Sequence, residues 1–347
     1  MAVFNHPEFD HHEQVVFCSD QEIGLRAIIA VHSTRLGPAV GGCRLWDYAT
    51  DEAAIVDVLR LSRGMTYKNA VAGLPLGGGK SVIIGNAKTI KSEQLFRAFG
   101  RMLHRLGGSY YSAEDVNITT GDIMQVYKET PYVAGLEGKS GNPGPFTALG
   151  TYKGIKAAAK HQFGSDDLAG KVVAVQGLGS VGFYLCEHLH KEGAQLIVTD
   201  INPDAIARAE AQFGATAVGL DDIYAAKADV YAPCALGATL NDITIPQLQA
   251  KIVAGCANNQ LQQARHGNML RERGILYAPD YVINAGGIIN VACEMRPQGY
   301  NAEESTAKVN EIYSTLLDIF ARADAEQRPT SEVADLMAQE IIARGKK

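Results

Sequence analysis

The chain has 347 residues, of which 46% are hydrophobic and 20% charged, and its formal net charge is −6. At roughly 100–200 residues per domain, this length favours two domains with ordinary globular cores. No Lys/Arg run stands out, so no nucleic-acid partner is expected. No uncharged apolar run reaches the ~18 residues that span a bilayer, and the N-terminus lacks the basic-then-apolar pattern of a secretory signal. We therefore expect a cytoplasmic protein with no membrane partner.

The cysteines and histidines give no pattern of metal ligands. Six cysteines are scattered without a C-x-x-C pair, which is typical of reduced core cysteines in a cytosolic protein. His11 and His12 lie in a polar N-terminal stretch. His188 and His190 are two apart on a predicted helix and therefore point in different directions. No metal site is expected.

The first part of the chain alternates short strands with helices. Residues 25–32, LRAIIAVH, are rich in Ile and Val and predict a strand. Thr50 is the predicted N-cap of a helix that runs towards residue 68, and Ser92 that of a second helix, which ends at Gly107-Gly108. Residues 109–113, SYYSA, predict a strand. The side chains expected to be buried along the second helix are Leu95, Phe96, Phe99, Met102, Leu103 and Leu106.

Residues 138–147, GKSGNPGPFT, are the strongest break in the chain, as expected of a linker or hinge. Beyond it, the predicted strands KVVAVQ, QLIVTD, DVYAP and KIVAGCA are separated by helical stretches, one of them at 203–213. This alternation predicts βαβ units and a parallel sheet. The last helical stretches, about 302–323 and 331–343, are expected to return to the first domain.

A dinucleotide-binding fingerprint stands at Gly177-Leu178-Gly179-Ser180-Val181-Gly182, which matches G-x-G-x-x-G. A β-branched strand precedes it, a helix follows, and Asp200 ends the next strand about 20 residues on. Gly177 permits the tight turn, Gly179 lets the backbone approach the pyrophosphate, and Gly182 lets helix and strand pack closely. Asp200 can bind the ribose hydroxyls and would repel a 2′-phosphate, which favours NAD over NADP. The alternative is a glycine turn of another α/β protein, which the complete context disfavours.

A second glycine-rich stretch, AGLPLGGGKSVIIG at 72–85, resembles a phosphate-binding loop. A P-loop requires G-x-x-x-x-G-K-[ST] followed by a helix. Counting back from Gly79-Lys80, the first glycine should be at position 74, which is Leu74. The residues after Lys80 form a β-branched run that predicts a strand. We reject the P-loop and interpret Lys80 as a lysine held by a glycine-rich turn beside an apolar strand.

Two lysines and one carboxylate suit a substrate that has its own carboxylate and amine. The candidates are Lys68, Lys80 and Asp115, which falls just past a predicted strand. One lysine pairs with the substrate carboxylate, while a partly desolvated lysine has its pKa lowered towards neutrality and acts as an acid/base. The aspartate handles the amine proton. The alternative for each residue alone is a solvated surface charge, but the glycines beside Lys80 open backbone space that a surface lysine does not need.

Nine segments, in chain order and spanning nearly the full length, resemble the glutamate/leucine/phenylalanine/valine family of amino-acid dehydrogenases, most closely its leucine-oxidising branch. They are GPAVGGCR (37–44), RGMTYKNAVAGLPLGGGKSVIIG (63–85), AEDVNIT (113–119), SGNPGPFTA (140–148), AVQGLGSVG (174–182), LIVTDIN (196–202), YAPCALGATLND (231–242), GCANNQL (255–261) and YAPDYVINAGGIINVA (277–292).

The resemblance implies an oxidoreductase that converts an L-amino acid, NAD⁺ and water into a 2-oxo acid, ammonium and NADH. Lys68 would bind the α-carboxylate, and Lys80 would be the catalytic acid/base that activates water. Asp115 would move protons at the amine and the carbinolamine. Because Lys80 must be neutral to deprotonate water, deamination should have an alkaline optimum. The active cleft should lie between the two domains and close to exclude water.

The resemblance also implies residues that position the reactants. The backbone at Gly41 and Gly42 would approach the substrate, which Asn259 would help to position. Asn258 would help to position the nicotinamide, and Thr147 would face it. The Gly177–Gly182 turn, including Ser180 and Val181, and Asp200 would hold the rest of NAD.

The implied architecture is an α/β fold of two domains. Residues 1–137, with a C-terminal return helix at about 325–347, would form an N-terminal α/β domain with a mixed sheet that binds the substrate and mediates oligomerisation. Residues 141–324 would form a Rossmann-type NAD-binding domain with a doubly wound parallel sheet. The tail is shorter than in octameric members, so we expect a homo-oligomer between a dimer and an octamer.

Apolar residues stand at the positions that contact the substrate side chain in this family: Val40, Ala113, Ile288 and Val291. By this resemblance, glutamate dehydrogenases have a lysine at the position that matches Val40, and this lysine binds the side-chain carboxylate of glutamate. At the position that matches Val291 they have a small residue with a hydroxyl group. A glutamate side chain would be buried here without a partner, which costs several kcal/mol. We therefore predict branched aliphatic substrates, namely leucine, valine and isoleucine.

Two alternatives stay open. Apolar pockets discriminate weakly, with one methylene worth roughly 1–3 kcal/mol, so phenylalanine or another aromatic amino acid is an alternative substrate. A non-catalytic NAD-binding regulator is less favoured, because a sensor does not need Lys68, Lys80 and Asp115.

Overall fold

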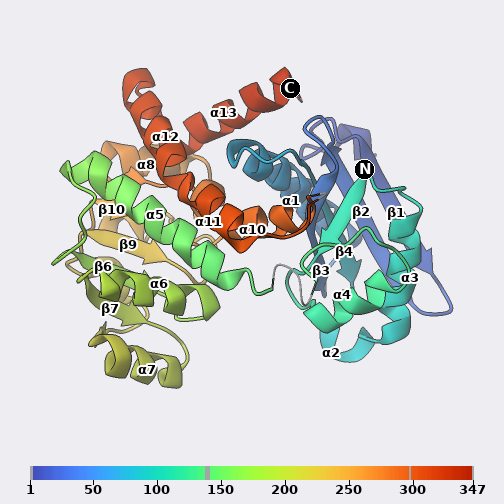
Figure 1. The fold of residues 1–347 in the computed structure, drawn as a ribbon, viewed down its shortest axis with the longest axis horizontal. Coiled ribbons are helices and arrows are strands. Elements are labelled where there is room, and N and C mark those ends of the chain that lie inside the picture. The colour runs from blue at the N-terminus through green and yellow to red at the C-terminus, as the bar shows by residue number, and fades with distance from the viewer. Residues whose placement is uncertain (1–2, 137–140, 297, 346–347) are drawn as a thin grey trace. The chain divides into compact units, whose positions relative to one another are not determined.

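The computed structural model describes residues 3–136, 141–296 and 298–345. Residues 137–140 of the predicted linker thus lie outside the described residues. The chain forms two compact units (Figure 1). Unit 1 comprises Met1–Gly141, Val291–Asn301 and Ala338–Lys347, and unit 2 comprises Asn142–Asn290 and Ala302–Met337. The second unit therefore begins within the predicted linker.

Unit 1 is built on a mixed sheet of five strands with the order β1-β2-β4-β3-β5. The strands are β1 Gln14–Asp20, β2 Leu25–Ser33, β3 Ala39–Trp46, β4 Gly77–Ile84 and β5 Tyr110–Ala113. β1 and β4 run antiparallel to β2, whereas β3 runs parallel to β4 and to β5. The predicted mixed sheet is confirmed.

Helices cover both faces of this sheet. They are η1 Val3–Asn5, α1 Asp51–Val71, α2 Ala87–Ile90, α3 Glu93–His104 and α4 Thr120–Tyr127. Thr50 and Ser92 cap α1 and α3 as predicted, each accepting a backbone N–H. Val58 and Leu59 of α1 pack on Val82 on one face, and the apolar stripe of α3 packs on the other. Of the six side chains predicted to be buried along this helix, four are buried in the core. Met102 and Leu106 are only partly buried and pack against the core.

Unit 2 contains a parallel sheet with the order β11-β10-β9-β6-β7-β8. The strands are β6 Val172–Gln176, β7 Gln195–Thr199, β8 Thr216–Ala217, β9 Val230–Pro233, β10 Ile252–Val253 and β11 Leu276–Tyr277. Numbered from β6, this is the 3-2-1-4-5-6 order of the Rossmann fold, whose ligands bind where the order reverses. Here that switch point lies between β6 and β9. The predicted Rossmann-type sheet is confirmed.

The helices of the second half alternate with these strands and then continue to the C-terminus (Figure 1). They are α5 Gly144–Phe163, α6 Ser180–Lys191, α7 Pro203–Phe213, η2 Asp222–Ala225, η3 Ile245–Gln247, α8 Arg265–Glu272, α9 Asp280–Ile283, α10 Gly286–Glu294, α11 Ala302–Asn310, α12 Ile312–Glu326 and α13 Thr330–Arg344. No described helix is long and apolar enough to cross a membrane.

The domain boundaries differ from the predicted ones at two places. Residues 291–301 belong to unit 1 and not to unit 2, and the chain returns to unit 1 at residue 338 and not at about 325. The stretch 302–323 stays in unit 2 because α11 and α12 pack against α5. The second half of the predicted linker is also helical, since α5 begins at Gly144.

The glycines before Lys80 form a strand, and the predicted glycine-rich turn is wrong. Gly77, Gly78 and Gly79 are the first residues of β4. A Cβ at Gly78 would lie 2.0 Å from the backbone nitrogen of Thr66 in α1, and one at Gly79 would lie 2.6 Å from the Tyr110 ring. The glycines therefore let α1 and β5 pack directly against the β4 backbone.

Candidate functional site

Lys80 and Asp115 form an ion pair in unit 1, in which the lysine is buried and the aspartate is half-buried. Lys80 lies in β4 and Asp115 follows β5, with side chains 7% and 23% exposed. Lys80 Nζ lies 2.8 Å from Asp115 Oδ2. Burial raises the pKa of the Asp115 carboxyl, but the positive charges of Lys80 and Arg44 outweigh burial, and the net pKa is lowered. Asp115 is thus a carboxylate that can accept a proton.

Three further residues extend this pair, and the sequence reasoning missed all of them as site residues. Arg44 Nε donates to the same Asp115 Oδ2 at 3.0 Å. Arg44 Nη1 donates to Asp57 of α1 at 3.0 and 3.3 Å, and the Tyr48 hydroxyl donates to Asp57 at 2.6 Å. Arg44 could have been found from the alternation of side chains along a strand. Because it is two positions after Gly42, it lies on the same face of β3 as Gly42.

The predicted substrate-binding residues of β3 lie beside this pair. Val40 is paired with Gly78 and Gly42 with Ala113 in the sheet register. A Cβ at Gly41 would lie 1.9 Å from the Gly79 oxygen, and one at Gly42 would lie 2.4 Å from the Glu114 oxygen. Both glycines therefore have a role in packing, while their approach to a substrate stays a prediction.

Lys68 is half-buried on α1. It is three positions after Met65, whose Cγ lies 3.2 Å from the Cβ position of Gly41, so Lys68 and Met65 share a helix face. On α10, Ile288 and Val291 are also three apart and share a face. Val291 belongs to unit 1, where its Cγ2 lies 4.0 Å from the Cβ position of Gly135, and Ile288 belongs to unit 2.

In unit 2 the glycine fingerprint has the geometry that a pyrophosphate needs. Gly177 has φ +101°, and a Cβ at Gly182 would lie 2.0 Å from the Gly177 oxygen. A Cβ at Gly179 would meet only open space. Gly179 immediately precedes α6, whose N-terminus begins with Ser180 and Val181 and offers backbone N–H groups to an anion.

Asp200 lies at the carboxyl end of β7, beside this turn. Its Oδ2 accepts from Leu178 N at 2.6 Å and its Oδ1 from Asn202 N at 2.8 Å. Each carboxylate oxygen has a second lone pair, so Asp200 can accept further hydrogen bonds from ribose hydroxyls. The residues present therefore fit a dinucleotide.

Thr147 and Asn258 are linked to the same region through neighbouring contacts. The Cβ position of Gly144, one turn before Thr147, lies 2.6 Å from Ser180 Oγ. The Cβ position of Gly286 lies 3.0 Å from Thr147 Cα. Two residues before Gly286, Asn284 Nδ2 donates to Asn258 Oδ1 at 2.7 Å.

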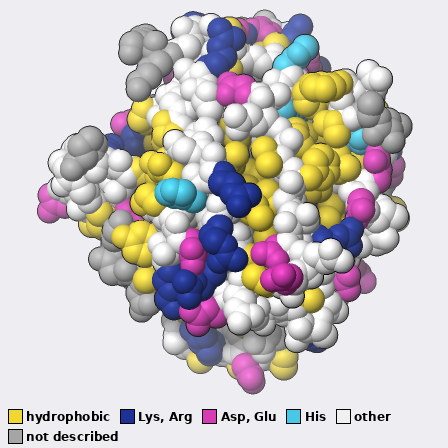
Figure 2. Space-filling view, turned by 90° about the vertical axis from the view of Figure 1, so that its right-hand side faces the viewer, with side chains coloured by type: hydrophobic (Ala, Val, Ile, Leu, Met, Phe, Trp, Pro, Cys, Tyr) yellow, Lys and Arg dark blue, Asp and Glu magenta, His cyan; other side chains and the backbone are white. Residues whose placement is uncertain are grey.

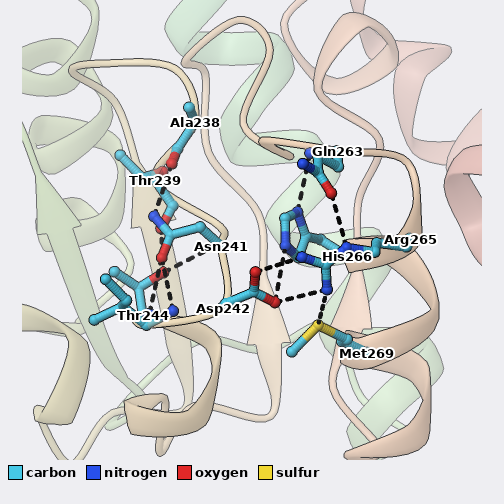
Figure 3. A network of polar contacts seen from close by, with 10 residues as sticks. Ala238, Thr239, Asn241, Asp242, Thr244, Gln263, Arg265, His266 and Met269 are labelled. Atoms are coloured by element: carbon cyan, nitrogen blue, oxygen red, sulfur yellow. Dashed lines mark hydrogen bonds and ion pairs between the residues drawn. The ribbon is translucent and has the colours of Figure 1, made fainter.

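The loop after β9 is tied to the loop that carries Asn258 and Asn259. Ala238 N donates to Asn259 O at 2.7 Å, and both residues have left-handed backbone angles, with φ of +57° and +52°. Figure 3 shows the side chains around this loop, where Asp242 lies against Arg265 and His266. The network fixes the loop and, through it, the backbone of Asn259.

Two family profiles match the chain. The profile described as "Glu/Leu/Phe/Val dehydrogenase, dimerisation domain" matches residues 12–134, and "Glutamate/Leucine/Phenylalanine/Valine dehydrogenase" matches residues 199–344. The chain is 56% identical over 345 residues to a leucine dehydrogenase of Geobacillus stearothermophilus, covering 99% of this chain and 94% of that protein. The chain belongs to the Glu/Leu/Phe/Val dehydrogenase family.

A relative whose name refers to an aromatic amino acid also matches the chain. The chain is 49% identical over 337 residues to an L-tryptophan dehydrogenase of Nostoc punctiforme, covering 97% of this chain and 95% of that protein. The crystal structure of L-tryptophan dehydrogenase from Nostoc punctiforme superposes with a TM-score of 0.85 at 47% identity and covers 96% of each chain. The resemblance read from the sequence is confirmed.

Proposed function

We propose that this chain catalyses the NAD-dependent oxidative deamination of the branched-chain L-amino acids leucine, valine and isoleucine to 2-oxo acids and ammonium, and the reverse reductive amination. The observation that carries the proposal is the ion pair between the buried Lys80 and the half-buried Asp115, with its oxygen–nitrogen distance of 2.8 Å. The 56% identity to a leucine dehydrogenase over nearly the full chain supports it.

NAD is the proposed cofactor, and when bound it supplies the acceptor for the hydride that leaves the substrate Cα. The Gly177–Gly182 turn and the N-terminus of α6 would hold the pyrophosphate. Asp200 would bind the ribose hydroxyls, and its negative charge would repel a 2′-phosphate. Thr147 and Asn258 would hold the nicotinamide.

The remaining proposed roles belong to residues that hold the substrate or move its protons. Lys68 would pair with the α-carboxylate, which the backbone of Gly41 and Gly42 and the side chain of Asn259 would help to orient. Asp115, kept ionised by its cations, would take a proton from the substrate amine. Lys80 would then remove a proton from the water that attacks the imine carbon. This step requires a neutral Lys80, so deamination should be faster in alkaline solution.

Apolar side chains support the choice of an aliphatic substrate. Val40 and Val291 are buried and Ala113 and Ile288 are partly buried, so a charged substrate side chain would lose its hydration there without an opposite charge. The alternative is an aromatic substrate, which the 49% identity to an L-tryptophan dehydrogenase keeps in consideration.

A homo-oligomer formed through unit 1 is the proposed assembly. β1 is an edge strand that pairs only with β2 among the described strands, and Phe17 on it is 58% exposed. Figure 2 shows hydrophobic side chains gathered on one face of the molecule. The profile matched by residues 12–134 is that of a dimerisation domain. An unpaired edge with apolar side chains is suited to strand pairing with a second copy.

A substrate panel tests the proposal. NADH formation would be followed with leucine, valine, isoleucine, phenylalanine, tryptophan and glutamate, each with NAD⁺ and with NADP⁺. We expect the highest kcat/KM for a branched-chain amino acid with NAD⁺. Faster turnover of phenylalanine or tryptophan than of leucine would instead establish the aromatic alternative.

The substitution Lys80→Ala separates an enzyme from a non-catalytic NAD-binding protein. We expect leucine oxidation to fall by about 10³-fold or more, because the proposed base is lost, while NADH binding measured by fluorescence stays unchanged. Lys88→Ala, at an exposed lysine of α2, is the matched control and should keep the wild-type rate. A Lys80→Ala variant with near-wild-type turnover would refute the mechanism.

A further inference from the structure

Asp115 is held by two cations on one of its two carboxylate oxygens. Lys80 Nζ lies 2.8 Å and Arg44 Nε 3.0 Å from Oδ2. In the part of the chain that the structure describes, Oδ1 accepts no hydrogen bond from another protein group. This arrangement leaves Oδ1 as the oxygen that can meet a substrate amine.

Arg44 is itself held in place from the other side. Its Nη1 donates to both oxygens of Asp57, at 3.0 and 3.3 Å, and Asp57 also accepts from the Tyr48 hydroxyl at 2.6 Å. Burial alone would lower the pKa of Arg44, but Asp115 and Asp57 raise it overall. Charges thus alternate along Lys80, Asp115, Arg44 and Asp57, which lie in β4, after β5, in β3 and in α1 of unit 1.

We propose that Arg44 and Asp57 are positioning residues that keep Asp115 ionised and oriented while Lys80 loses and regains its proton. The inference rests on the proposed function of Lys80 and Asp115 and adds residues to it. When Lys80 is neutral, Asp115 has lost its nearest positive charge. Arg44 stays protonated and continues to hold Oδ2, because a guanidinium is not deprotonated in proteins. Asp57 keeps Arg44 from turning away.

Arg44 and Asp57 place opposite charges beside the Lys80–Asp115 pair. Removing one or the other therefore changes the electrostatic field at the pair in opposite directions. Burial raises the pKa of the neighbouring Cys43 to about 12 and also raises the pKa of Tyr110 and Tyr48, so these three groups are neutral. Asp122, whose charge also acts on Cys43, is paired with Lys91. Arg44 and Asp57 are the charged groups that extend the Lys80–Asp115 pair by direct contact.

The test is the pH profile of kcat/KM for leucine oxidation in two variants. Arg44→Gln removes the positive charge, so the rising limb should move to higher pH by about one unit. Asp57→Asn leaves Arg44 without its counter-charge, so the limb should move to lower pH. A residue with a merely structural role would not produce shifts of opposite sign.

Two further variants serve as conservative and matched controls. Arg44→Lys keeps the charge but cannot hold Asp115 and Asp57 at once, so the limb should stay in place while kcat falls about tenfold and KM changes little. Arg26→Gln breaks another Arg–Asp pair to α1, the exposed pair with Asp51, and should leave both the profile and kcat unchanged.

The outcomes distinguish this inference from the proposed function. If the wild type oxidises leucine and Lys80→Ala does not, but Arg44→Gln and Asp57→Asn keep the wild-type profile and kcat, the inference is overturned and the proposed function stands. Circular dichroism and NADH binding report whether each variant is folded. If Arg44→Gln and Asp57→Asn do not fold, Arg44→Lys decides, and a wild-type kcat in that variant overturns the inference.

Discussion

His12 is a buried imidazole that the surrounding fold holds neutral. Its Nε2 lies 3.0 Å from Leu59 O, to which it donates, and its Nδ1 accepts from Asp10 N at 3.2 Å, so Nδ1 has no room for a proton. Burial lowers the pKa of His12 to about 4. The unfolded chain, with its pKa near 6.5, therefore binds the proton first as the pH falls.

From this shift we expect the free energy of unfolding to decrease between pH 6.5 and pH 4, by about 3 kcal/mol from this residue alone. Urea unfolding across that range would measure it. His12→Gln removes the titration and should flatten this part of the curve. His11→Asn is the control, since His11 is exposed and Asn tolerates its φ of +51°. Parallel wild-type and His12→Gln curves would contradict the assignment.

Local residue patterns in the sequence predicted some residues of the candidate site but not others. Lys80 and Asp115 were predicted because each stands in a motif with a strand beside it. Arg44 and Asp57 were missed because their roles depend on tertiary contacts, such as that between Arg44 and Asp115, which are 71 positions apart. His12 was read as part of a polar stretch, and only the packing of α1 over it explains its burial.

At the scale of elements, β4 is a strand where the strand propensity of its residues predicted a turn. Glycine is depleted in strands, so three consecutive glycines predicted a turn. The structure has a strand there because α1 and Tyr110 need the space of the missing side chains. Three elements were predicted well because their own residues carry the signal. β2 is an apolar run, α3 has an apolar stripe, and α7 is bounded by Pro203 and Gly214.

Gly78→Ala tests this account of β4. The added Cβ would lie 2.0 Å from the backbone nitrogen of Thr66, so α1 must move, and we expect a loss of about 3 kcal/mol in the free energy of unfolding. Gly64→Ala in α1 is the matched control, because its Cβ meets nothing within 4 Å and should stabilise the helix by roughly 0.5–1 kcal/mol. Chemical denaturation measures both. Equal stability of the two variants would show that the contact is easily relieved.

At the scale of the whole molecule, the two-domain organisation followed from the glycine- and proline-rich break and from the change in strand rhythm. The place where the chain returns to unit 1 could not be predicted, because α11 to α13 have similar sequence patterns. Their membership depends on packing partners, such as α5 for α12, which the local pattern does not contain.

Phe17→Asp tests the proposed assembly through unit 1. Phe17 is 58% exposed on the edge strand β1, and a buried aspartate at an interface would lack a partner, so we expect a shift to smaller species. Light scattering coupled to size-exclusion chromatography measures the mass. Ile243→Asp, at a side chain of unit 2 that is 76% exposed, is the matched control and should keep the wild-type mass. An unchanged mass for Phe17→Asp, or a monomeric wild type, would exclude β1 as the interface, and a loss of mass only for Ile243→Asp would move the interface to unit 2.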